Sequence, residues 1–159
     1  MKTVEVILYD FSELGDEAKE RARDDHRQTW QPVWCEESKE SIETFLRRFG
    51  VSLTRYEVDA YSYDYATDMS QSTFRGLKLK DFDREYMPTG YCLDADLWQT
   101  FYDKFKATGC ARIAFIEALD AAFDSWSKDL EYQQSDEYID DFLEANQYQF
   151  TSDGKFFWA

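Results

Sequence analysis

The chain has 159 residues and carries 33 acidic against 18 basic side chains, for a formal net charge of −15. Its 13 Phe, 11 Tyr and five Trp provide enough apolar area for a packed core, which excludes a disordered acidic tail. The acid surplus argues against direct binding to nucleic acid or anionic membranes, because both require basic surface. No apolar run approaches the roughly 18 residues of a membrane span, and no signal peptide is expected.

The length predicts one domain over residues 1–159, and the N-terminal elements follow in order. Residues 4–9 are rich in β-branched side chains and predict a first strand. A helix is expected over residues 14–30, because its least polar residues recur every four positions. Those residues are Leu14, Ala18, Ala22, His26 and Trp30.

The middle of the chain combines a second helix with strands. The helix is expected over 35–49, with Gly50 in the position that follows a helix end. Residues 51–66 predict one long strand or two short ones. Residues 73–79 predict a further strand, weakened by Gly76, and residues 87–91 predict a turn around Pro88 and Gly90.

Helices return in the last third, over residues 94–107 and 111–132. The longer one has an apolar stripe made of Ile113, Ile116, Leu119, Phe123, Trp126 and Leu130. Ser135 is expected to cap a last helix, and Asp153-Gly154 between aromatic runs predicts a hairpin. The C-terminal run of this hairpin reaches Trp158, which lies outside the residues that the structure describes.

These elements predict an α+β fold. It should be a single domain with a small, mostly antiparallel sheet that includes both terminal strands. Four to five helices should pack against this sheet.

The negative charge is concentrated near the C-terminus, where residues 111–159 hold 11 acids and three bases. On a helical wheel, four acids of the 111–132 helix fall within about 60° of one another. They are Glu117, Asp120, Asp124 and Glu131. The last helix carries a second group made of Asp136, Asp140, Asp141 and Glu144.

Two interpretations of these acids remain open. They form a solvated face that keeps the protein soluble, or an acidic ridge that docks on a basic surface built for nucleic acid. Tyr61, Tyr63 and Tyr65 alternate with polar residues, so they form either a packed strand face or an exposed aromatic anchor beside the ridge.

Residue types for catalysis and metal binding are scarce. His26 is the only histidine and is expected to pack within its helix. Cys35, Cys92 and Cys110 are an odd, widely spaced set, which favours free thiols in a reducing cytoplasm. Asp94 and Asp96 are best explained as helix-capping residues. We therefore expect no catalytic residue, metal site or cofactor.

The segment 9–23, YDFSELGDEAKERAR, resembles the start of a group of small phage- and prophage-encoded proteins of unknown function. The later segments TGYCLD at 89–94, SDEYI at 135–139, Ala145-Asn146 and FTSDGK at 150–155 are similar to the same group. The resemblance implies a bacterial virus as context. It transfers no catalytic residue, and small acidic phage proteins often resemble anti-CRISPR or anti-restriction inhibitors.

The sequence as a whole favours a non-enzymatic inhibitor in the cytoplasm of a bacterial host, monomeric or homodimeric. It would bind a basic, nucleic-acid-binding surface of a host defence complex through the acidic ridge. The alternatives are a phage structural or assembly accessory, a general protein-interaction module, and a small enzyme that uses carboxylates.

Overall fold

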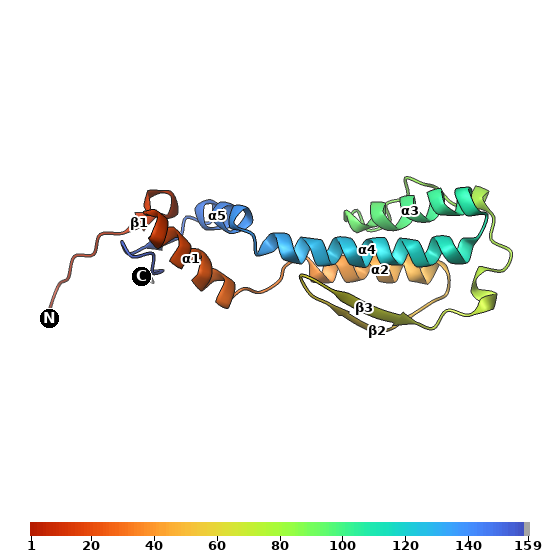
Figure 1. Cartoon of the computed structure of the whole chain (residues 1–159), viewed down its shortest axis with the longest axis horizontal. Helices are drawn as coiled ribbons and strands as arrows, with labels where there is room; N and C mark the ends of the chain where they lie inside the picture. Colours follow the sequence, from red (N-terminus) through yellow and green to blue (C-terminus); the bar gives the residue numbers. More distant parts are fainter. Residues whose placement is uncertain (158–159) are drawn as a thin grey trace. The chain divides into compact units, whose positions relative to one another are not determined.

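A computed structural model of the chain describes residues 1–157 and has the predicted α+β class. Its described part holds five α-helices and four strands, the strands in two antiparallel pairs (Figure 1). The helices are α1 (Asp16–Gln28), α2 (Cys35–Arg48), α3 (Leu93–Thr108), α4 (Ala111–Gln133) and α5 (Asp136–Ala145). The strands are β1 (Tyr9–Asp10), β2 (Leu53–Val58), β3 (Tyr63–Thr67) and β4 (Gln149–Phe150).

The chain divides into two compact units, which we call the terminal unit and the central unit. The terminal unit holds Met1–Gln31 and the chain from Tyr132 onward, and the central unit holds Pro32–Glu131. Each unit has its own two-stranded sheet and its own buried side chains. We describe each unit by itself.

The terminal strands share one sheet, as predicted, because β1 pairs antiparallel with β4 in the register Tyr9 to Phe150. The strand predicted over residues 4–9 is wrong for most of its length, since pairing begins only at Tyr9. The chain turns directly after β4, so the earlier residues meet no partner strand among the described pairs. Val4 and Ile7 are accordingly 76% and 75% exposed.

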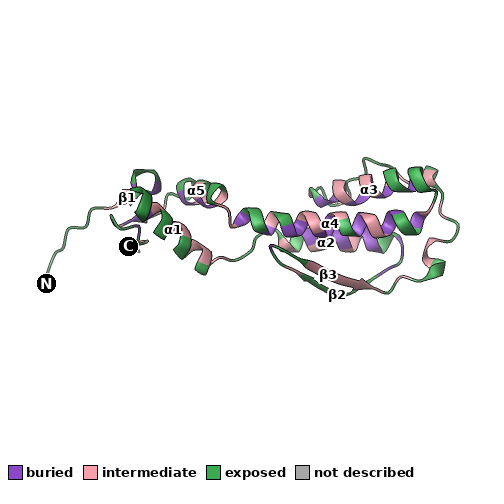
Figure 2. Ribbon diagram, in the orientation of Figure 1, coloured by how far each residue is buried: buried purple, intermediate pink, exposed green. Residues whose placement is uncertain are grey.

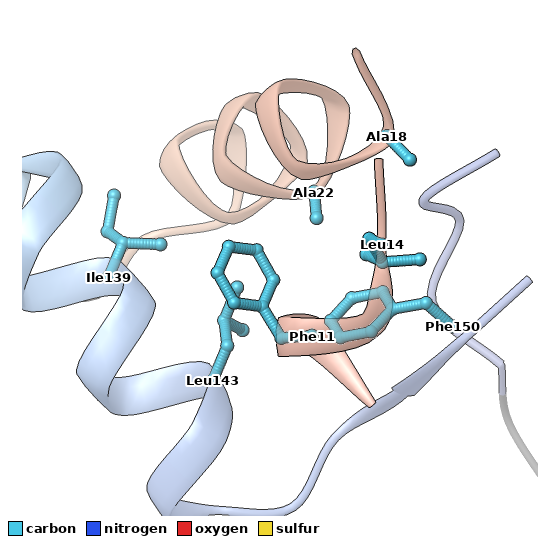
Figure 3. Packing of buried hydrophobic residues seen from close by; sticks show 7 residues of the cluster. All are labelled: Phe11, Leu14, Ala18, Ala22, Ile139, Leu143 and Phe150. Carbon is cyan, nitrogen blue, oxygen red and sulfur yellow. The ribbon is translucent and has the colours of Figure 1, made fainter. Parts of the chain in front are cut away.

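Seven buried apolar residues form the core of the terminal unit (Figure 3). The short 3₁₀ turn before α1, Phe11–Glu13, places Phe11 against Phe150 with ring centroids 6.2 Å apart. The small side chains Ala18 and Ala22 allow α1 to lie close to this cluster. The members are Phe11, Leu14, Ala18, Ala22, Ile139, Leu143 and Phe150.

The predicted Asp153-Gly154 hairpin is confirmed, and it packs on α1. The Thr151 amide donates to the Lys155 carbonyl at 2.9 Å, and Phe150 bridges Phe156 in antiparallel fashion. Gly154 has φ +85°, and a Cβ there would lie 2.0 Å from the Ala18 carbonyl oxygen. Only glycine permits this close approach.

The central unit has a core built mainly of phenylalanines from α2, α3 and α4. Phe45 of α2 stacks on Phe115 of α4 at 5.5 Å and meets Phe101 of α3 edge-on at 6.0 Å. Each buried ring contributes about 1.5–3 kcal/mol through removal from water, and the ring pairs add about 0.5–1.5 kcal/mol. The purple stripes of buried residues in Figure 2 mark the faces of α2 and α4 that supply this core.

Two predictions fail in the central unit. The strand expected over residues 73–79 is replaced by 3₁₀ turns at Gln71–Phe74 and Leu79–Asp81. The Phe74 ring packs on Phe115 at 5.0 Å, so this apolar segment covers core without pairing in a sheet. Ile113, expected in the buried stripe of α4, is 44% exposed.

Candidate functional site

The outer face of α4 carries the predicted acids of the central unit, between two neighbouring elements. On one side Tyr65 of β3 contacts Asp120, and on the other Lys104 of α3 reaches Glu117. Figure 1 shows α4 between α3 and the β2–β3 hairpin. We call Glu117, Asp120, Asp124 and Glu131 the α4 acidic face.

Of the three tyrosines at 61, 63 and 65, two pack against α4 and one is exposed. The Tyr65 ring stacks on Phe123 of α4 with centroids 4.5 Å apart and planes 6° from parallel, and Tyr63 stacks on the same ring at 5.9 Å. Both are therefore packed strand-face residues. Tyr61 precedes β3 in the turn and is 83% exposed, so it alone of the three presents a free aromatic surface.

A phenol fixes one carboxylate of the α4 acidic face. The Tyr65 hydroxyl donates to Asp120 Oδ1 at 2.6 Å. Burial, this hydrogen bond and the Asp120 charge all raise the pKa of Tyr65, so the phenol stays a donor at neutral pH. Asp120 is therefore held in place, whereas an exposed aspartate usually samples several rotamers.

Two lysines offset part of the negative charge of the α4 acidic face. Lys104 Nζ lies 3.2 Å from Glu117, and Lys128 Nζ lies 2.7 Å from Asp124. All four side chains are at least 43% exposed, and such pairs contribute only about 0–1 kcal/mol. Glu131 is exposed, with Lys128 as its nearest cation on α4.

A half-buried carboxylate that the sequence did not single out as an interaction residue adjoins this face. Asp96 of α3 accepts a hydrogen bond from Ser125 of α4 and lies near Asp124. Burial raises the pKa of Asp96, and the Asp124 charge raises it further. Protons are thus held more readily at this edge than at an exposed aspartate.

In the terminal unit, the row of α5 acids is partly neutralised by arginines of α1. Asp140 accepts two hydrogen bonds from Arg23, and Asp136 accepts one from Arg27. The Asp140 hydrogen bond is the main cause that raises the pKa of Arg23. Asp136 and Asp140, which the sequence placed in the candidate acidic ridge, are therefore paired within the protein, because helix packing turns them toward cations on α1.

The remaining acids of α5 lie on its exposed side. Glu137, Asp141 and Glu144 are exposed, and no cation lies within ion-pair distance of them in residues 1–157. The terminal unit thus presents a smaller acidic surface than the sequence predicted. The α4 acidic face belongs to the central unit and is the more complete of the two.

The residues considered for catalysis and metal binding are scattered. His26 contacts the Phe142 ring at 5.1 Å, and burial followed by the Arg27 charge lowers its pKa. The three cysteines are free thiols, with Cys92 exposed and the other two half-buried. Within residues 1–157, no group of His, Cys, Asp and Glu side chains has the arrangement of a metal site.

A buried polar cluster in the central unit forms around Asp94. Asp94 is fully buried, and its Oδ2 accepts hydrogen bonds from the Thr89 amide, the Thr89 hydroxyl and the Gly90 amide at 2.8–2.9 Å. Ser41 of α2 bonds the Thr89 hydroxyl at 3.0 Å. Asp94 therefore ties loop 89–92 to α3 and does not cap its own helix as predicted, since the cap position falls at Cys92.

A local signal for this loop existed in the sequence. The TGYCLD segment places a threonine and a glycine four to five residues before an aspartate at a helix start. Gly90 has φ +77°, a conformation that frees its amide to point at the carboxylate. The pattern is short, so burial of the aspartate is what distinguishes it from an ordinary cap.

Comparisons with family models, with curated proteins and with solved structures gave no match to this chain. None of the helices in residues 1–157 has the length and apolar character needed to cross a membrane.

Proposed function

We propose that the protein is a non-enzymatic binding protein whose α4 acidic face docks on a basic, nucleic-acid-binding surface of a partner protein. The main observation behind the proposal is the row of carboxylates on the α4 acidic face. Asp120 is held by Tyr65, and Asp124 lies one turn further along the helix. Side chains at this spacing have Cβ atoms about 5–6 Å apart, so their carboxylates form a row of negative charges along one helix face.

The resemblance to phage and prophage proteins supplies the biological context of the proposal. We infer a phage-encoded inhibitor of a host defence complex, of the anti-CRISPR or anti-restriction type, that acts in the bacterial cytoplasm. The acid surplus supports a basic partner, because a cationic surface would relieve the repulsion among like charges on one face.

The proposal concentrates on the central unit. Asp136 and Asp140 already have arginine partners, so docking through them would require those ion pairs to be replaced. Glu117, Asp124 and Glu131 have exposed lysines or none nearby, and these are easily displaced by an arginine-rich surface. Exposed Tyr61, at the end of the neighbouring hairpin, is available as an aromatic contact.

The test compares two variants with equal changes of charge. Asp124→Lys with Glu131→Lys alters the α4 acidic face and leaves the Tyr65–Asp120 bond intact. Glu57→Lys with Asp81→Lys changes two exposed acids elsewhere in the central unit. Each tagged protein is used to capture partners from bacterial lysate at about 0.05 M and 0.3 M salt, where screening differs strongly, and captured proteins are identified by mass spectrometry.

We expect the wild type and the control variant to retain the same nucleic-acid-binding protein at low salt, and the α4 variant to lose it. Competitor DNA should release the partner, since both ligands would occupy one surface. Retention of the same partner by the α4 variant, or resistance to both salt and DNA, would contradict the proposal. Recovery of the protein alone, or of a phage virion component, would favour the assembly alternative.

A further inference from the structure

A hollow in the central unit lies between the start of α2 and loop 89–92. Its volume is about 350 Å³. Three glutamates of α2 form one wall, and the loop forms the other. The lining residues are Glu36, Glu37, Glu40, Thr89 and Tyr91.

One aromatic ring lines this hollow, and a second ring stacks on the first. Tyr91 lines it, and the Trp34 indole stacks on Tyr91 with ring centroids 6.3 Å apart and planes 19° from parallel. Trp34 is 54% exposed, although an indole of this size is normally buried. Stacked rings with an exposed face are typical binding surfaces for planar or cationic groups.

The rings are held by a rigid framework. Asp94 fixes the amides of Thr89 and Gly90, and Ser41 bonds the Thr89 hydroxyl. Ser38 of α2, 1% exposed, hydrogen-bonds the Tyr91 hydroxyl. The loop wall is therefore ordered before any ligand arrives, which reduces the entropy lost on binding.

Among residues 1–157, two of the three glutamates form no ion pair. Glu40 is paired with Arg47 at 2.8 Å, and Lys39 is paired with Glu43 at 3.7 Å. Within residues 1–157, no lysine, arginine or histidine lies within ion-pair distance of Glu36 or Glu37, and both are exposed. Both lie in the first turn of α2, where the helix dipole favours acidic side chains, and their carboxylates remain open to a cation from outside.

We propose that this hollow binds the guanidinium group of an arginine side chain presented by a partner protein. The planar cation would stack on the Tyr91 and Trp34 rings, while Glu36 and Glu37 accept its N–H groups. Arginine fits better than lysine, because its flat, weakly hydrated head both stacks and donates in a fork to carboxylates. The site goes beyond the proposed function, and it stands whether or not the α4 acidic face binds anything.

The backbone at Trp34 provides an unusual test. Trp34 has φ +67°, a left-handed conformation that favours glycine over any aromatic residue. Trp34→Gly therefore removes the ring while it relieves the backbone, so the variant should fold at least as well as the wild type. Loss of binding in this variant reports the indole and not a damaged structure.

The measurement is a ¹⁵N NMR titration of the full chain with a blocked Gly-Arg-Gly peptide. The same peptide with citrulline, a neutral isostere of arginine, is the ligand control. We expect the arginine peptide to shift the Trp34 indole and the Thr89 and Tyr91 amides. The citrulline peptide should bind at least about fivefold more weakly, because the cation–ring and carboxylate attractions both require charge.

Protein variants separate this site from general attraction to an acidic protein. Trp34→Gly and the pair Glu36→Gln with Glu37→Gln should each weaken the arginine peptide at least about threefold. The pair Glu117→Gln with Glu131→Gln makes the same charge change on α4 and should leave the affinity for the arginine peptide unaltered.

The proposal would be overturned if the citrulline peptide bound as tightly as the arginine peptide. It would also be overturned if the α4 pair of substitutions weakened binding of the arginine peptide as much as the substitutions at the hollow do. Shifts confined to α4 would overturn it as well. The Asp124→Lys with Glu131→Lys variant should bind the peptide normally, so failure of the proposed function leaves this result distinct.

Discussion

Arg23 of α1 donates two hydrogen bonds to Asp140 of α5, from Nε to Oδ1 at 2.7 Å and from Nη2 to Oδ2 at 2.8 Å. The arginine side chain is 17% exposed and the aspartate 32%, so water screens this pair less than the surface pairs of α4. The contact joins two residues that are 117 positions apart in the chain. Arg23 also lies 4.0 Å from Asp136, so it offsets the repulsion between these two aspartates.

Asp140→Asn should lower the free energy of unfolding of the terminal unit by about 1–2 kcal/mol, because a charge-assisted bidentate contact becomes a neutral one. Hydrogen exchange of the α1 and α5 amides measures this unit specifically. Asp141→Asn, exposed on the same helix, is the matched control and should change stability by less than about 0.5 kcal/mol. Equal effects of the two variants would show that Arg23 contributes nothing specific.

Gly154→Ala should destabilise the terminal unit by about 3 kcal/mol or more, because its Cβ would collide with the Ala18 carbonyl and its φ of +85° is unfavourable for alanine. Gly76→Ala is the control, since φ there is +78° but no atom lies within 4 Å of the added Cβ. That change should cost about 1 kcal/mol. Thermal unfolding followed by circular dichroism compares the two, and similar costs would mean that the hairpin moves off α1 without penalty.

His26 predicts a pH dependence of the terminal unit. Burial, then the Arg27 charge, lowers its folded-state pKa below the ordinary 6.5, so the unfolded chain takes up a proton first as the pH falls. Above about pH 7, His26 therefore does not reduce the free energy of unfolding. This free energy declines below about pH 6.5, as the pH falls through the lowered folded-state pKa of His26. Urea unfolding across this range should show the decline in the wild type and a flatter profile in His26→Gln. An unchanged slope in the variant would assign the effect to other groups.

Asp94→Ala should cost about 1–3 kcal/mol in the central unit, because three hydrogen bonds from loop 89–90 to a fully buried carboxylate are lost. The loop should loosen as well, and the exposed Cys92 beside it offers a readout through its rate of alkylation. Asp81→Ala, exposed in a 3₁₀ turn, is the control for both measurements. Unchanged stability and alkylation would mean that Asp94 does not hold the loop.

Local patterns in the sequence determined most helices of this protein. The α2 and α3 bounds, the Ser135 cap and the left-handed glycines at 50 and 109 follow from periodicity and end signals that act within a few residues. The strand over 4–9 and the strand over 73–79 failed, since a strand requires a partner that local sequence does not specify.

For the candidate sites too, local sequence specified some features and tertiary contacts decided the others. Sequence alone located the acids of α4 and α5, because their spacing on a helix is fixed by the helical repeat. Only the tertiary structure decided which of them stay exposed. Arg23 neutralises Asp140 and Tyr65 holds Asp120 through contacts between distant segments. The Trp34–Tyr91 stack likewise joins residues 57 positions apart, so it exists only once α2 and loop 89–92 have packed together.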